Sequence, residues 1–188
     1  MNVRLLALAA PLLLTGAAPA PGPAPDTAGA FLSYDRAVVP AGARARLTVH
    51  DTETGVRVNL LATGLKPRHA YGAHLHTSRC GKDPADAGPH YQHSVDPAAA
   101  PGQPSVDPAF ANPRNEIWLD FTTDAFGTGK AVSVQEWPFD ESRPPWSLVL
   151  HAEHTHTAPG QAGTAGPRLA CLTRDGIRAT YQNRPGRG

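Results

Sequence analysis

The chain has 188 residues, 6% aromatic residues and a formal net charge of +1. This length suits one domain with one core, and the nearly neutral charge without any lysine or arginine run argues against binding to nucleic acid or to a membrane surface. The 20 prolines and 18 glycines, with little helical periodicity, favour β-structure with long loops.

The N-terminal segment has the layout of a secretory signal peptide. A positive charge at Arg4 precedes an apolar run over residues 5–14, and small residues follow it. The run is too short to span a bilayer, and no cysteine follows it that would carry a lipid anchor. We therefore predict a signal peptide over residues 1–20, a secreted protein with no membrane anchor, and a disordered Pro/Ala-rich spacer over residues 21–30.

Residues 31–176 are predicted to form the folded domain, followed by a polar tail over residues 177–188. Alternating apolar and polar residues predict a hairpin of two strands, 45–50 and 56–61. Further strands are predicted at residues 31–35, 71–76, 116–122, 130–135 (pairing with 116–122), 146–151 and 169–172. With about eight short strands and no convincing helix, we predict an all-β fold, an antiparallel Greek-key β-sandwich or barrel with long loops.

Four of the nine histidines are placed as metal ligands would be. His74 and His76 are two apart on a predicted strand, so both rings share one face. His90 lies within residues 81–114, a stretch without periodicity that is long enough to be a functional loop. His151 ends another predicted strand. Each signal alone is weak, since surface histidines are common, but together the four suggest a metal site.

The chain has only two cysteines, Cys80 and Cys171. In an exported protein such a pair most simply forms one disulfide. It would close a loop of about ninety residues and stabilise the fold by roughly 4 kcal/mol. Two unpaired buried thiols are the alternative.

Five short blocks between residues 72 and 171 resemble the copper/zinc superoxide dismutase family in their order and in their residues. They are Gly72-Ala73-His74-Leu75-His76, Cys80, Gly88-Pro89-His90, Leu148-Val149-Leu150-His151 and Gly166-Pro167-Arg168-Leu169-Ala170-Cys171. The likeness runs from about Arg44 to Cys171, and its closing block is the most specific. Together with the predicted signal peptide, the blocks resemble those of a secreted bacterial member of this family.

The resemblance implies a copper-dependent enzyme that converts superoxide to dioxygen and hydrogen peroxide, as Cu(II) and Cu(I) alternate. One copper ion per chain would be bound by His74, His76, His90 and His151. His90 would also carry a proton, and Arg168 would dock the small anionic substrate, because a guanidinium stays charged. Cys80 would pair with Cys171. The resemblance leaves open whether the protein is a monomer or a homodimer.

The departures from the family concern zinc. Ala98 stands where the family has a histidine, the later His-x-x-Asp pattern is missing, and Thr155 stands near the place of an aspartate that links the two metal sites. His93 and Asp120 are the remaining candidate zinc ligands. We therefore predict a copper-only protein that binds no zinc. Glu116 is a candidate acceptor for the His90 ring, the alternative being an exposed glutamate at a strand edge.

Two further alternatives remain at this stage. His154 and His156 either capture a metal ion at the rim of the site or are solvated loop residues. A secreted protein that binds or sequesters copper without dismutation would use the same four histidines. Arg168 favours the enzyme, because copper storage needs no cation aimed at an incoming anion.

Overall fold

The computed structural model describes residues 27–174, and the predicted signal peptide and C-terminal tail lie outside this range. The regular secondary structure of the described residues is β-strand except for one short 3₁₀-helix, η1 (Pro84–Ala87), and long loops connect the strands. The strands are β1 (Thr27–Ala30), β2 (Leu32–Ser33), β3 (Arg44–Asp51), β4 (Val56–Thr63), β5 (Ala70–His76), β6 (Phe121–Thr122), β7 (Gly129–Gln135), β8 (Ser147–His151) and β9 (Arg168–Thr173). Within residues 27–174 no helix has the length and apolar character needed to cross a membrane.

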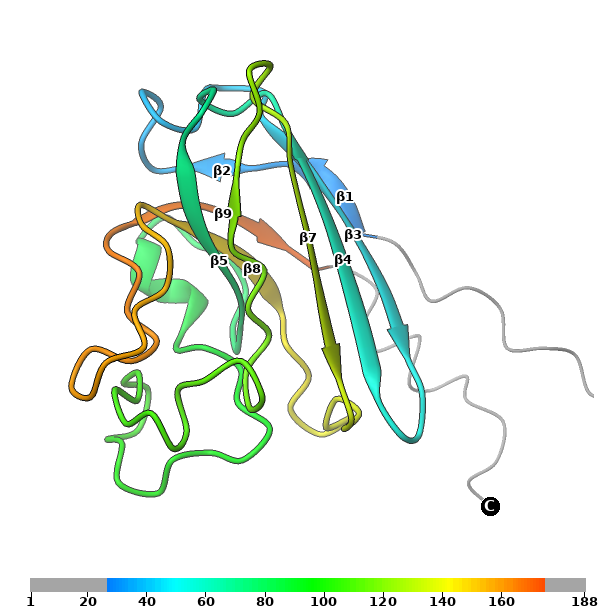
Figure 1. Ribbon diagram of the computed structural model, residues 1–188, viewed down its shortest axis with the longest axis vertical. Helices are drawn as coiled ribbons and strands as arrows, with labels where there is room; N and C mark the ends of the chain where they lie inside the picture. The colour runs from blue at the N-terminus through cyan, green and yellow to red at the C-terminus, as the bar shows by residue number, and fades with distance from the viewer. Residues whose placement is uncertain (1–26, 175–188) are drawn as a thin grey trace, which may run out of the picture.

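The strands form two antiparallel sheets that pack face to face (Figure 1). One has the order β1-β3-β4-β7 and the other the order β2-β9-β8-β5-β6. The chain leaves the first sheet after β4, builds β5 and β6 in the second, and returns to pair β7 with β4. This crossing between sheets is a Greek-key connection, and the fold is the predicted antiparallel β-sandwich.

The hydrophobic core lies between the sheets because strand residues alternate between two faces. In β3 and β4 the alternation is regular, with Leu47, Val58 and Leu60 buried and their neighbours more exposed. The predicted β3–β4 hairpin is confirmed by continuous pairing from Arg44↔Thr63 to Asp51↔Val56.

The second sheet is buried on both faces at β5 and β8. All residues of β8, and all of β5 after Ala70, are buried. Ala73 and Leu75 belong to the core, so His74 and His76 lie on the opposite, outer face. Two loops cover that face: the green loop after β5 and the orange loop after β8 lie on the same side of the molecule (Figure 1). They are joined by the Gly160 N–H, which donates to the Val106 carbonyl over 3.2 Å.

Three details of the sequence prediction are wrong. Thr27–Ala30 pairs with β3 as a strand and is not part of a disordered spacer. Residues 130–135 pair with β4 rather than with 116–122. Of residues 116–122 only Phe121–Thr122 form a regular strand, because Glu116 and Trp118 make only isolated bridges, with Gln92 and His74.

Cys80 and Cys171 form the predicted disulfide, which joins the loop after β5 to β9 across a sequence separation of 91 residues. It packs on the outer face of the second sheet with Ala87 and Val149. A disulfide of this kind fits an oxidising environment. It anchors the start of the loop that carries His90.

We expect a Cys80→Ser/Cys171→Ser double variant to lose about 4 kcal/mol of unfolding free energy, because the unfolded chain regains the entropy of a long open loop. Urea unfolding of the metal-free proteins measures this difference. An unchanged transition midpoint with an unchanged slope would contradict it.

Candidate metal centre

His74, His76, His90 and His151 come together on the outer face of the second sheet. Each offers one ring nitrogen, and these four nitrogens all lie within 4.8 Å of one another. Nitrogens on opposite sides of one ion with bonds of about 2.0–2.1 Å would lie about 4 Å apart, so the observed spacing suits a single metal ion.

Strand pairing sets the position of three of these rings. β5 and β8 pair so that Gly72 lies opposite His151, with His74 and His76 following on the same face of β5. A register irregularity between Leu150 and His151 marks the end of β8, where the side chain of His151 turns to the cluster. A Cβ atom at Gly72 would lie 2.5 Å from the Glu153 carbonyl oxygen, so glycine is required where the covering loop passes.

His90 reaches the cluster from the long loop. It forms an isolated β-bridge with His76, and the next residue, Tyr91, donates its N–H to the Leu75 carbonyl over 2.8 Å. The loop is therefore laid along the end of β5, and this contact explains how a ligand far from β5 in sequence joins the other rings.

Three of the rings use Nδ1 for a protein partner and leave Nε2 for the cluster. Nδ1 of His76 lies 2.9 Å from the Gly88 carbonyl oxygen, and Nδ1 of His151 lies 3.4 Å from that of Gly166. Nδ1 of His90 lies 2.8 Å from Oε2 of Glu116. The Nε2 atoms of His76 and His151 are 3.3 Å apart, as two ligands of one ion would be.

His74 has the opposite arrangement. Its Nε2 lies 2.6 Å from the Thr155 hydroxyl, while its buried Nδ1 has no hydrogen-bond partner. Buried polar atoms without a partner are rare, and a metal ion would satisfy this nitrogen. The donor set therefore fits a metal: four imidazoles, with Nδ1 of His74 and Nε2 of the other three left for the ion.

The environment keeps the rings of His74, His76 and His151 neutral. Burial, followed by the nearby charge of His90, holds the pKa of both His74 and His76 well below 6.5. Burial, again with His90 as the next cause, lowers the pKa of His151 to about 3. Because an imidazole must be unprotonated to bind a metal, these rings remain able to bind at neutral pH.

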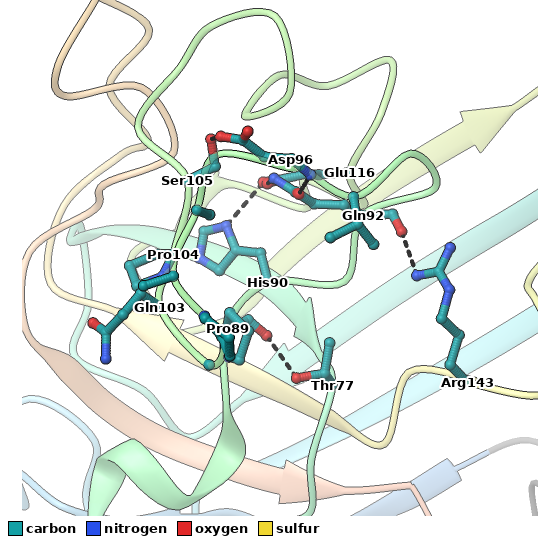
Figure 2. A pocket seen from close by; sticks show the side chains of 15 residues that line it. Thr77, Pro89, His90, Gln92, Asp96, Gln103, Pro104, Ser105, Glu116 and Arg143 are labelled. Atoms are coloured by element: carbon teal, nitrogen blue, oxygen red, sulfur yellow. Dashed lines mark hydrogen bonds and ion pairs between the residues drawn. The ribbon is translucent and has the colours of Figure 1, made fainter.

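Glu116 is the acceptor that holds His90. The residue is 1% exposed, and its carboxylate accepts hydrogen bonds from His90, from Gln92 Nε2 over 2.8 Å and from Trp118 Nε1 over 2.7 Å. The hypothesis that Glu116 contacts His90 is thus confirmed, and the alternative of an exposed strand-edge glutamate is wrong. Figure 2 shows His90 and Glu116 lining a pocket whose wall includes residues 99–105.

The two candidate zinc ligands are engaged elsewhere. The His93 ring stacks on Trp137, with centroids 4.7 Å apart and an interplanar angle of 10°. Asp120 accepts hydrogen bonds from Thr155 and from the Ala73 N–H. His90 Nδ1, the nitrogen that would face a second ion, is occupied by Glu116.

Arg168 lies beside the cluster at the start of β9 and is half-buried. Its guanidinium donates to the carbonyls of Pro84 over 2.7 Å and of Gly88 over 2.6 Å. The Gly88 oxygen also contacts His76 Nδ1, so one carbonyl connects the cation to a ring of the cluster. After burial and neighbouring histidines, the charge of Arg168 contributes to the lowered pKa of His74 and His76.

Gly88 was not predicted as a site residue. It has φ of +72°, and an added Cβ would lie 2.5 Å from the Thr77 hydroxyl, so only glycine fits. Thr155 and Asp120 were noted in the sequence only in connection with zinc, yet the structure places them beside His74.

His154 and His156 lie outside the cluster and are exposed. His154 Nε2 lies 3.1 Å from the Phe121 carbonyl oxygen, and His156 Nε2 lies 3.0 Å from a Glu153 carboxylate oxygen. These contacts agree with solvated loop residues.

Comparisons with known proteins give limited similarity. No protein-family model matches the chain, and no curated protein matches it. Among solved structures, the chain is similar to a double mutant of a superoxide-dismutase-like protein from Bacillus subtilis, with 16% identity, 71% of this chain and 88% of that chain covered, and a TM-score of 0.48. It is also similar to a Cu/Zn superoxide dismutase from Brucella abortus. The identity is 16%, the match covers 78% of this chain and 97% of that chain, and the TM-score is 0.45.

Both TM-scores are below 0.5, so the site is interpreted from the chain's own residues. The Greek-key sandwich, the four-histidine cluster and the Cys80–Cys171 disulfide fit a copper/zinc superoxide dismutase-like fold.

The lowered pKa of the buried rings predicts acid sensitivity of the metal-free protein. Between the ordinary histidine value of about 6.5 and the value of about 3 for His151, the unfolded state binds more protons than the folded state. The contribution of these neutral rings to the unfolding free energy is complete above about pH 6.5 and is lost as the pH falls toward 3. Urea unfolding of the chelator-treated protein between pH 7.5 and roughly pH 4 measures this loss.

His151→Gln removes one of the titrating rings and should give a shallower decline over the same range. Equal declines for the variant and the unmodified protein would contradict the assignment of His151 as a buried neutral ring.

Proposed function

We propose that the protein is a secreted, copper-dependent superoxide dismutase related to the copper/zinc family but without its zinc site. The observation that carries this proposal is the convergence of four ring nitrogens, three of them on buried histidines and one of these without a partner, beside the guanidinium of Arg168. Imidazole suits copper, and a tetragonal set of nitrogen donors suits Cu(II) in particular.

His74, His76, His90 and His151 would hold the ion. Bound copper would supply one-electron oxidation of one superoxide to dioxygen and one-electron reduction of a second, which with two protons gives hydrogen peroxide. Arg168 supplies a permanent positive charge that attracts the small anion and orients it at the cluster.

His90 is the residue suited to hold and deliver a proton at Nε2. It is the one ring of the four that is not fully buried, and it lines a pocket, so water can approach it. Glu116 accepts from Nδ1 and keeps the ring directed at the cluster while Nε2 gains or loses its proton.

The same contact supports a copper-only centre. In the zinc-containing family the corresponding histidine is expected to bridge two ions, and here a buried carboxylate occupies that side of the ring. Glu116 thus takes over the orienting role of a second cation. The disulfide and the predicted signal peptide support an extracellular location.

Elemental analysis coupled to a dismutase assay tests the proposal. We expect about one copper and almost no zinc per chain, with activity that requires copper and is lost in His151→Ala, because the variant lacks one of the four nitrogen donors that set the geometry around Cu(II). A full complement of zinc would refute the copper-only centre. Bound copper without activity would favour a secreted copper-sequestering protein instead.

Variants of Arg168 distinguish a superoxide dismutase from a protein that only stores copper. Arg168→Ala should lower kcat/KM at least about tenfold, since the fixed cation beside the site is removed. Arg168→Lys keeps the charge and should recover part of the loss, and its activity should remain sensitive to ionic strength. Copper content is measured in parallel, and equal kcat/KM in all three proteins at equal copper content would remove Arg168 from the mechanism.

A further inference from the structure

The Thr155 hydroxyl lies between a ring of the cluster and a carboxylate. Its Oγ1 is 2.6 Å from Nε2 of His74 and donates to Oδ1 of Asp120 over 2.9 Å. The direct separation between His74 Nε2 and Asp120 Oδ1 is 3.6 Å, too long for a hydrogen bond. The hydroxyl is therefore the link that connects the carboxylate to the ring.

The proton positions along this chain follow from the number of donors. A threonine hydroxyl has one proton, and Thr155 uses it on Asp120. Toward His74 the same oxygen can only accept, so the proton of the neutral ring must be on Nε2. Nδ1 then carries the free lone pair, and this is the buried nitrogen that has no protein partner.

Asp120 is itself fixed by the backbone. Its Oδ2 accepts from the Thr155 N–H over 2.7 Å, and its Oδ1 accepts from the Ala73 N–H over 3.1 Å. Ala73 directly precedes His74 in β5, whereas Thr155 lies in the loop after β8. The carboxylate thus clamps the covering loop to the strand that carries the ring, and the hydroxyl is held in place from both sides.

We propose that Thr155 is a positioning residue, whose hydroxyl links Asp120 to His74, fixes the Nε2–H tautomer and so presents Nδ1 to the metal. That the metal is copper rests on the proposed function, but the tautomer does not.

The link has a chemical consequence for the ion. The carboxylate accepts the hydroxyl proton and makes the hydroxyl oxygen a stronger acceptor for the Nε2 proton. This makes Nδ1 a better electron-pair donor to the metal and prevents rotation of the ring. Without the hydroxyl, Nε2 would lose its acceptor, and the tautomer with the proton on Nδ1 would become accessible. That tautomer cannot bind a metal through Nδ1.

The first experiment measures the tautomer in the metal-free protein by ¹⁵N NMR of the His74 ring. We expect a single Nε2–H tautomer in the unmodified chain and in Thr155→Ser, and a mixture or the Nδ1–H form in Thr155→Val. Thr164→Val, which removes an exposed hydroxyl that bonds only the Gln161 carbonyl in the same loop, is the matched control. An unchanged Nε2–H tautomer in folded Thr155→Val would overturn the proposal.

The second experiment measures Cu(II) affinity by competition with a chelator. Loss of a residue that orients a metal ligand costs about 10–100-fold in affinity, and we expect this loss in Thr155→Val but not in Thr155→Ser or Thr164→Val. Equal affinity in Thr155→Val and the unmodified chain would overturn the proposal. If no variant binds copper, the proposed function fails, and the tautomer measurement alone then decides the role of Thr155.

Discussion

The pairing of β5 with β8 is the constraint on which the site depends. It places His151 opposite Gly72 and beside the two histidines of β5, and the covering loops then add His90 to the same face. The core on the inner face holds these strands in register, because a shift by one residue would turn the rings toward the core. The disulfide joins the loop that carries His90 to β9, so the same bond stabilises the fold and helps to hold a metal ligand in place.

Each ring of the cluster has its own partner outside the cluster. Backbone carbonyls orient His76 and His151, a buried carboxylate orients His90, and a hydroxyl joined to a carboxylate orients His74. These partners decide which nitrogen faces the ion, and burial lowers the pKa of His74, His76 and His151 so that these three rings are neutral. The site is thereby organised before any metal arrives, which limits the rearrangement that binding requires.

Sequence patterns predicted the features that depend on local periodicity. The β3–β4 hairpin and the shared face of His74 and His76 follow from strand alternation, so both could be predicted. Thr27–Ala30 consists of small residues with no alternation signal, and its pairing with β3 became visible only in the structure. The partner of β7 is set by the Greek-key crossing, and the Thr155–Asp120 bond joins residues 35 positions apart, so neither has a local signature.

The central claim is that four imidazoles share one copper ion, and counting the nitrogens bound to Cu(II) tests it most directly. Pulsed electron paramagnetic resonance on the Cu(II)-loaded protein, with ¹⁵N-labelled histidine, reports this number. The account predicts coupling to four imidazoles, reduced by one in His151→Ala. Two or fewer coupled imidazoles, or a spectrum unchanged in that variant, would contradict it.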